Sequence, residues 1–393
     1  MTHAHSHSHV RSAGPAPRSV RIALAVVLVP LVAATVVGLV LLWPSSSEVR
    51  PPPGLAVERA HATVVDVHPC RNEVPQCLAA TVDLTSGAGA PGRAEAAMPF
   101  GAQAPEVEPG DRVVLSYFAE APAGQQYQFV DFDRTQPLLL LLGVFVAGVL
   151  LLSRWRGIGS LVSLAFSLGL ITVFALPALL EGSPPLAVAI VTASTIMILT
   201  LYLSHGFNMR TNVAMLGTLL ALALTGAIGS AFTALGSFTG LKEEESQFLG
   251  AVAGQVDLSG LLLAGLVIGA LGVLDDVTVT QASSVWELAD AEPQASTAAL
   301  FTRAMRIGRA HVASTVNTLV LAYVGATLPL LLVFSVIDIP FGVAVSQEPV
   351  AQEVVRGLVG GLGIIAAVPI TTAIAAAVAG TMRRDTQEAR ERV

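Results

Sequence analysis

Two adjacent carboxylates, Asp275 and Asp276, lie in an otherwise apolar stretch of the chain that begins at Leu258. Carboxylates at membrane depth are costly, so such residues indicate a functional site. Burial also favours the neutral form of a carboxyl group, which suits reversible proton transfer. The alternative is that both aspartates end the helix at the membrane surface, where water solvates them.

Asp276 continues a stripe of residues spaced three or four positions apart, as along one face of an α-helix. The stripe contains small residues first and polar residues after them: Gly265, Gly269, Gly272, Asp276, Thr280, Ser283 and Glu287. The glycines predict close packing against a neighbouring helix. Because Asp275 points about 100° away from this stripe, we expect Asp276 to be the more important of the two.

A second polar group, Thr315, Asn317 and Thr318, opens a later apolar stretch. Amides and hydroxyls in membrane helices usually bond across to a neighbour, and we expect that neighbour to be the Asp276 stripe. For Thr315, the alternative is a hydrogen bond to a carbonyl of its own helix. The candidate proton-relay or transport residues are therefore Asp275, Asp276, Thr280, Ser283, Glu287, Thr315, Asn317 and Thr318.

The composition is that of a membrane protein, with 53% hydrophobic residues, 12% charged residues and a mean hydropathy of +0.70. Apolar runs long enough to cross about 30 Å of hydrocarbon predict eight spans. These are residues 22–43, 137–153, 159–180, 185–204, 212–236, 258–276 or beyond, 311–334 and 354–380; the helical pattern of the sixth continues for about three turns after Asp276.

Arginines are concentrated on alternate loops, after the second, fourth, sixth and eighth spans, whereas the intervening loops are acidic. By the positive-inside rule, this pattern predicts a multi-pass protein of the cell membrane with both termini in the cytoplasm. Arg356, at the outer start of the eighth span, is the exception.

We expect five parts along the chain: a disordered His-rich cytoplasmic tail (1–21), a transmembrane anchor (22–43), an extracytoplasmic β domain (44–135), a seven-helix membrane domain (136–382) and a cytoplasmic tail (383–393). The β domain has short runs rich in β-forming residues at 60–67, 77–84, 112–118 and 126–132. Four or five strands are therefore expected, in a small OB-like barrel or a sandwich. Within the membrane domain, residues 289–310 predict an amphipathic segment on the cytoplasmic surface.

Cys70 and Cys77 are the only cysteines, and in an oxidising exterior they are expected to form a disulfide. The alternative is a metal site with His61 and His68. His3, His5, His7 and His9 are weak metal candidates, against a plain disordered tail or an added tag. No cofactor is expected.

The chain has no Walker A, GxSxG or HExxH pattern, so ATP-driven transport and common hydrolase chemistry lack support. An intramembrane aspartyl protease needs two facing carboxylates, whereas consecutive helical residues diverge. No nucleic-acid module is present. The expected partners are the lipid bilayer and an envelope protein at the β domain.

The segment LDDVTVTQASSVWEL resembles the YibE/F family of bacterial membrane proteins, and the likeness extends over the membrane region. The order of a Gly-rich helix with Asp, a following Glu, a basic segment and a helix with Asn-Thr is also similar to SecD/SecF and the resistance-nodulation-division permeases. That second similarity implies proton movement through Asp275 or Asp276, with Glu287, Asn317 and Thr318 at matching positions. It implies a homodimer too, because those permeases have two halves. Eight spans instead of six, and the lack of a mid-membrane Lys or Arg, depart from that pattern.

The function expected from these features is a proton-coupled secondary transporter or an export-assisting permease, not an enzyme. The alternative is a non-transporting scaffold or assembly factor whose exported β domain binds an envelope partner.

Overall fold

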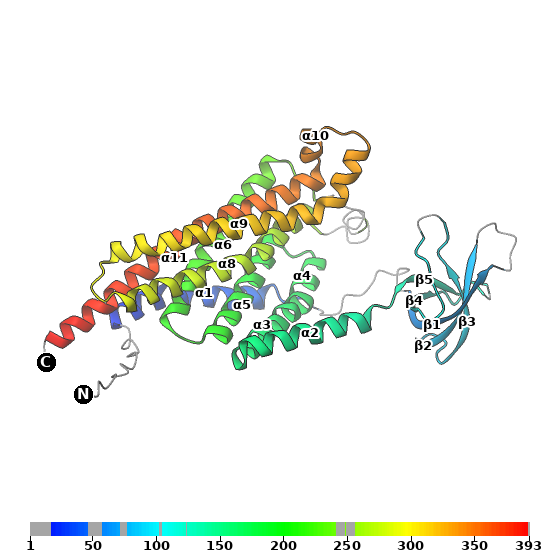
Figure 1. The fold of residues 1–393 in the computed structure, drawn as a ribbon, viewed down its shortest axis with the longest axis horizontal. Helices are drawn as coiled ribbons and strands as arrows, with labels where there is room; N and C mark the ends of the chain where they lie inside the picture. The colour runs from blue at the N-terminus through cyan, green and yellow to red at the C-terminus, as the bar shows by residue number, and fades with distance from the viewer. Residues whose placement is uncertain are drawn as a thin grey trace, which may run out of the picture. The chain divides into compact units, whose positions relative to one another are not determined.

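The computed structural model describes residues 17–45, 57–70, 77–101, 104–122, 124–240, 248 and 256–391, and it divides into two compact units. The barrel unit comprises Arg50–Gly157, and the helical unit comprises Met1–Val49 together with Ile158–Val393. Both are drawn in Figure 1. The histidines of the N-terminal tail and the acidic loop around position 242 lie outside the described residues.

The barrel unit contains a closed five-stranded barrel, so the barrel alternative is the one found. Its strands, in the order β1-β2-β3-β5-β4, are antiparallel except for the β3–β5 pair. Their bounds are β1 (Glu58–Pro69), β2 (Leu78–Gly87), β3 (Gly92–Met98), β4 (Arg112–Tyr117) and β5 (Tyr127–Phe132). Strand β3 has the sequence GRAEAAM, whose glycine and alanines have low strand propensity. Its pairing with β2, and not its composition, makes it a strand.

Alternate residues along the strands fill the barrel interior, as the period of two requires. Val64, Val82, Ala96 and Leu115 are almost fully buried and belong to one apolar cluster. Helix α2 (Thr135–Ser153) follows β5, and none of its residues is buried. A largely apolar helix of this length with no buried residue suits a hydrocarbon environment.

The structure has eight helices, among the described residues, that are long and apolar enough to cross a membrane, and this confirms the predicted number. The α3 helix (Trp155–Leu170), a π-helical turn η1 (Ile171–Ala175) and α4 (Leu176–Leu180) together make one of them. The other helices are α1 (Arg18–Leu41), α5 (Pro185–His205), α6 (Met209–Leu235), α8 (Leu258–Ala291), α9 (Thr297–Val336), the short α10 (Phe341–Ser346) and α11 (Glu348–Glu391).

Helix α8 is the centre of the helical unit. It packs against α5, α6, α9 and α11, and α11 in turn packs against α6 and α9 (Figure 1). One arc of α8 is therefore buried along most of its length, including Val267, Leu274, Val277 and Val285. The helix that carries the adjacent carboxylates thus packs against four other helices of this unit.

Helix α9 differs from the prediction of a separate amphipathic surface segment followed by a membrane helix. It runs without a break for 40 residues from its N-cap Ser296, whose side chain accepts a hydrogen bond from the Ala299 amide. Leu300 and Ala304 are fully buried in the helical unit. The apolar face of this segment therefore packs on neighbouring helices and does not lie free at a surface. Helix α8 continues beyond residue 276 to Ala291, as its helical pattern predicts.

Candidate functional site

The C-terminal half of α8 is joined to neighbouring helices by buried polar side chains. The Thr278 hydroxyl lies 2.5 Å from the Thr218 hydroxyl of α6, and both residues have no exposed surface. Gln281, which is 1% exposed, donates from Nε2 to the Ala304 carbonyl of α9 at 3.0 Å and to the Thr372 hydroxyl of α11 at 2.7 Å. One amide therefore connects three helices. Sequence counting missed Gln281 because it lies far around the helix from the Asp276 stripe.

The two adjacent aspartates have different surroundings. Asp275 is partly buried, and its Oδ1 atom is shielded from solvent with no hydrogen-bond partner in the described part of the chain. Asp276 is exposed. Asp275 lies 17 residues after the start of α8, which corresponds to about 26 Å along the helix. A shielded carboxylate oxygen without a donor is the more unusual arrangement, so the structure directs attention to Asp275.

The stripe that contains Asp276 lies on the open side of α8. Gly272 and Thr280 are exposed with it, as are Asn317 and Thr318 on α9. Thr318 donates to the Ser314 carbonyl of its own helix at 3.0 Å. Within the described residues, no hydrogen bond joins Asp276 to Thr315, Asn317 or Thr318. The expected contact between the two polar groups is not formed.

Glu287 and Ser283, the remaining candidates on the stripe, also have surroundings that sequence spacing does not predict. Glu287 is exposed and accepts a hydrogen bond from Arg210, at the start of α6, at 3.0 Å. Arg210 also reaches Asp290 at 3.3 Å. Ser283 is partly buried. Glu287 thus ties the C-terminal end of α8 to the N-terminal end of α6.

An ion pair on α11 lies toward the other end of α8. The Arg356 guanidinium donates to both carboxylate oxygens of Glu353, at 2.8 and 2.9 Å, and the Glu353 side chain is only 7% exposed. Arg356 also lies over the Tyr323 ring, 5.9 Å from its centroid. Arg356 is eight residues into α11, or about 12 Å along the helix. Charges at such a position in an apolar helix indicate function.

The glycines of α8 provide the space for this cluster. A Cβ atom at Gly265 would lie 4.0 Å from Arg356 Nη2, and one at Gly269 would lie 3.6 Å from the Tyr323 hydroxyl. Larger side chains at these positions would meet the polar ends of both residues. Sequence analysis noted Arg356 only as an exception to the charge rule. Glu353, one helical turn earlier, was the signal that these two residues form a pair.

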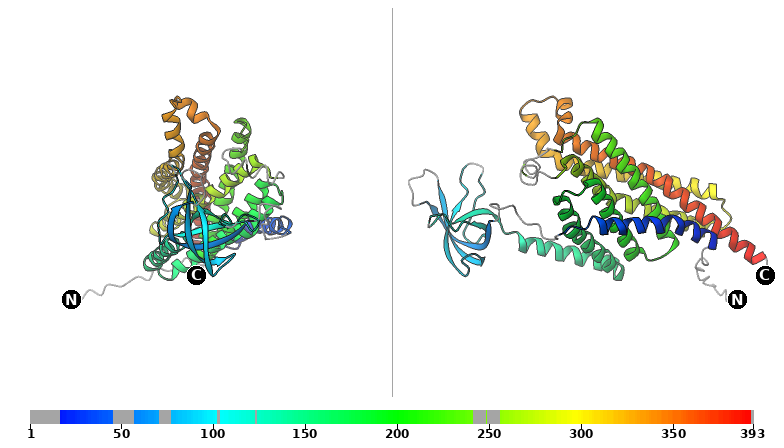
Figure 2. Two further views of the ribbon diagram at one scale, coloured as in Figure 1. Left: turned by 90° about the vertical axis from the view of Figure 1, so that its right-hand side faces the viewer. Right: turned by 180° about the vertical axis from the view of Figure 1, so that it is seen from behind.

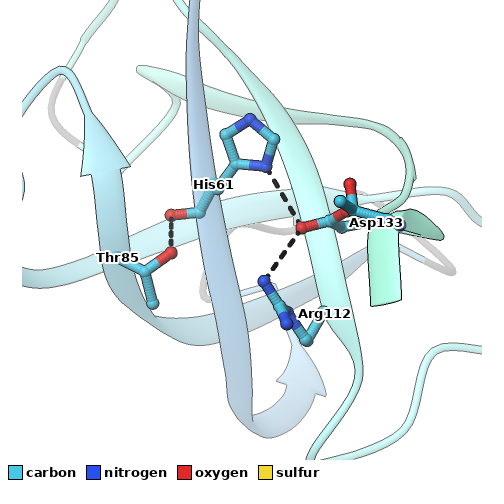
Figure 3. Close-up of polar contacts among 5 residues, drawn as sticks. His61, Thr85, Arg112 and Asp133 are labelled. Carbon is cyan, nitrogen blue, oxygen red and sulfur yellow. Dashed lines mark hydrogen bonds and ion pairs between the residues drawn. The ribbon is translucent and has the colours of Figure 1, made fainter. Parts of the chain in front are cut away.

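The barrel unit has a separate polar cluster where β5 leads into α2 (Figure 3). Asp133, whose side chain is 5% exposed, lies 3.3 Å from His61 Nδ1 of β1 and 3.2 Å from the Arg112 guanidinium of β4. It also accepts a hydrogen bond from the Thr135 amide at 3.0 Å. Hydrogen bonds from Thr135, followed by those from His61 and the charge of Arg112, lower the pKa of Asp133 to about 2. Asp133 therefore ties two strands to the first turn of α2.

Cys70 and Cys77 form a disulfide, as predicted, with their Cα atoms 5.3 Å apart. His68 lies beside Cys70 in sequence but bonds weakly to Thr81, at 3.5 Å. No group of three or more His, Cys, Asp or Glu residues suited to a metal ion is found among the residues that the structure describes. The four tail histidines lie outside that part of the chain.

Comparison with known proteins agrees with one of the two sequence resemblances. The family model described as YibE/F-like protein matches residues 141–381. No match is found among curated proteins or among solved structures. The fainter similarity to SecD/SecF and the resistance-nodulation-division permeases receives no support. Because the matched region covers more than half of the chain and contains α8, α9 and most of α11, this protein belongs to the YibE/F family.

Proposed function

We propose that the helical unit spans a cell membrane and conducts protons, alone or coupled to a solute, with Asp275 as the group that gains and loses the proton. The orientation that accompanies this proposal places both termini in the cytoplasm and the barrel outside. The Arg-rich loops that alternate with acidic loops support that orientation.

The observation that carries the proposal is the shielded Oδ1 atom of Asp275, which has no hydrogen-bond partner in the described part of the chain. A purely structural carboxylate is normally paired or hydrogen-bonded. An oxygen left free on a helix that packs against four others is available to a proton or a passing cation. The Arg356–Glu353 pair supplies a second charged position, toward the other end of α8.

The proposal is tested by proton flux into proteoliposomes that contain the full-length protein and a trapped pH-sensitive dye. Asp275→Asn removes the titratable group and nearly conserves shape, so it should abolish flux. Asp276→Asn is the matched control, since it is the same substitution at an exposed neighbour, and it should retain most of the flux. The helical stripe alone predicts the opposite result, with flux lost in Asp276→Asn and retained in Asp275→Asn. The two variants therefore decide which aspartate carries the proton. Full activity in both correctly inserted variants would overturn the proposal.

A second candidate function, a scaffold that binds an envelope protein, is favoured by one feature of the barrel. A cavity of about 320 Å³ is lined by Leu78, Met98, Phe100 and neighbouring residues. Phe100 is 53% exposed and Leu78 is 37% exposed, which is unusual for large apolar side chains near a cavity. Under this alternative, Asp275→Asn complements a deletion strain as well as wild type does, whereas Phe100→Ser fails to complement it.

A homodimer is part of the first proposal. Asp276, Thr280, Asn317 and Thr318 are exposed on α8 and α9. Polar side chains at membrane depth seldom face lipid, so contact with a second copy is a reason for their presence. Cross-linking of Asn317→Cys in membranes tests this contact, and a purely monomeric product would contradict it.

A further inference from the structure

A long groove separates α1 from α5 and α6 in the helical unit. It encloses about 1250 Å³, and its walls are mainly apolar side chains such as Leu28, Val32, Ile198 and Leu203. Figure 2 shows α1, in blue, running alongside the other helices of this unit. Leu24 and Leu28 are buried against the bundle, but most of the α1 surface remains exposed. The groove is thus an apolar channel open along its side.

Two arginines lie at one end of this groove. Arg18 and Arg21, in the first turn of α1, are exposed and line it. In the described part of the chain, neither guanidinium has a hydrogen-bond or ion-pair partner. None of the described residues that line the groove is acidic. Asn212 lies at the same end, and its Oδ1 atom accepts a hydrogen bond from the Tyr202 hydroxyl at 2.9 Å.

The length of the groove corresponds to one leaflet of a bilayer. From Arg21 to Ala33 the helix advances 12 residues, or about 18 Å. Half of a hydrocarbon core of about 30 Å is about 15 Å. An acyl chain that enters the groove would therefore place its headgroup beside the two arginines. Arginine forms bidentate hydrogen bonds with phosphate, and basic pockets between membrane helices bind anionic headgroups.

We propose that this groove is a binding site for an anionic phospholipid, with the phosphate held by Arg18 and Arg21 and an acyl chain lying along α1 between Leu28 and Ile198. The proposal rests on the membrane location proposed above but not on proton conduction. Bound lipid would fill the space that α1 leaves open and would hold this helix against α5 and α6.

Native mass spectrometry of the full-length protein provides the test. The purified protein is titrated with phosphatidylglycerol and, separately, with phosphatidylcholine of the same acyl chains. Wild type should bind phosphatidylglycerol more tightly. Arg18→Gln combined with Arg21→Gln should weaken that binding about thirtyfold, because a basic residue near an anionic lipid is worth about 1 kcal/mol and each such step is about a fivefold change in affinity.

Two further variants distinguish lipid binding in the groove from attraction of lipid to any positively charged surface. Arg306→Gln with Arg309→Gln removes two exposed arginines of α9 that do not line the groove, and phosphatidylglycerol binding should persist. Ala33→Phe fills the apolar part of the groove and leaves both arginines in place, so it should weaken binding as well. Equal loss in the two double variants, no effect of Ala33→Phe, or equal affinity for the two lipids would each overturn the proposal.

Discussion

The buried Arg356–Glu353 pair leads to a prediction about the free energy of unfolding. It compares the effect of removing one member of the pair with the effect of removing both. Glu353→Gln and Arg356→Gln are made singly and together. Each single change removes one member of the pair and leaves the other charge in an apolar part of the helical unit. The double change leaves no charge there.

The expected magnitudes follow from burial. Removing one partner of a buried ion pair costs about 3–5 kcal/mol, whereas replacing both partners is often close to neutral. The Arg356 side chain is 24% exposed and that of Glu353 is 7% exposed. Water reaches the guanidinium more easily than the carboxylate. Each single change should therefore lower the free energy of unfolding by an amount near the lower end of this range, about 3 kcal/mol. The double variant should lose about 1 kcal/mol of stability or less, because only the hydrogen bonds of the pair are lost.

The free energy of unfolding can be measured for the full-length protein by steric trapping in bicelles. Glu287→Gln is the control, because it breaks the Arg210–Glu287 pair, whose side chains are 39% and 73% exposed. Exposed pairs of this kind contribute at most about 1 kcal/mol. If the two single losses at positions 353 and 356 simply add in the double variant, the side chains are not coupled and the reasoning from the buried pair is refuted.

Two other predictions concern the barrel and the orientation of the helices. The folded pKa of Asp133 is about 2, below the value of about 3.9 for an unfolded chain, so its stabilising contribution is complete above about pH 4 and disappears as the pH falls through 2. Thermal unfolding of the barrel, followed by circular dichroism, should show wild type more stable than Asp133→Asn at pH 6 and equal to it near pH 2; a constant difference would contradict the assignment. In intact cells, a cysteine at Lys242 should react with an impermeant thiol reagent and a cysteine at Arg306 should not, and reversed labelling would invert the proposed topology.

The number of spans and the presence of a small β domain could be predicted from sequence alone, because both depend on local patterns, but the choice between a barrel and a sandwich could not. Crossing hydrocarbon requires a run of about 20 apolar residues, and a half-buried strand requires alternation. The disulfide was predictable for a similar reason, since seven positions separate its cysteines in the chain. Strand β3 was missed because its alanines and glycine have no strand preference of their own.

The surroundings of the site were decided only by tertiary packing. A helical wheel gives the angle between Asp275 and Asp276, but it does not say which arc of the helix meets its neighbours. In the structure, the arc with Thr278 and Gln281 faces α6, α9 and α11, and the glycine-aspartate stripe is left open. Glycines favour close approach, yet at Gly265 and Gly269 the approaching groups are Arg356 and Tyr323. Sequence spacing therefore determined which residues share a face, and the positions of the other helices determined which face is buried.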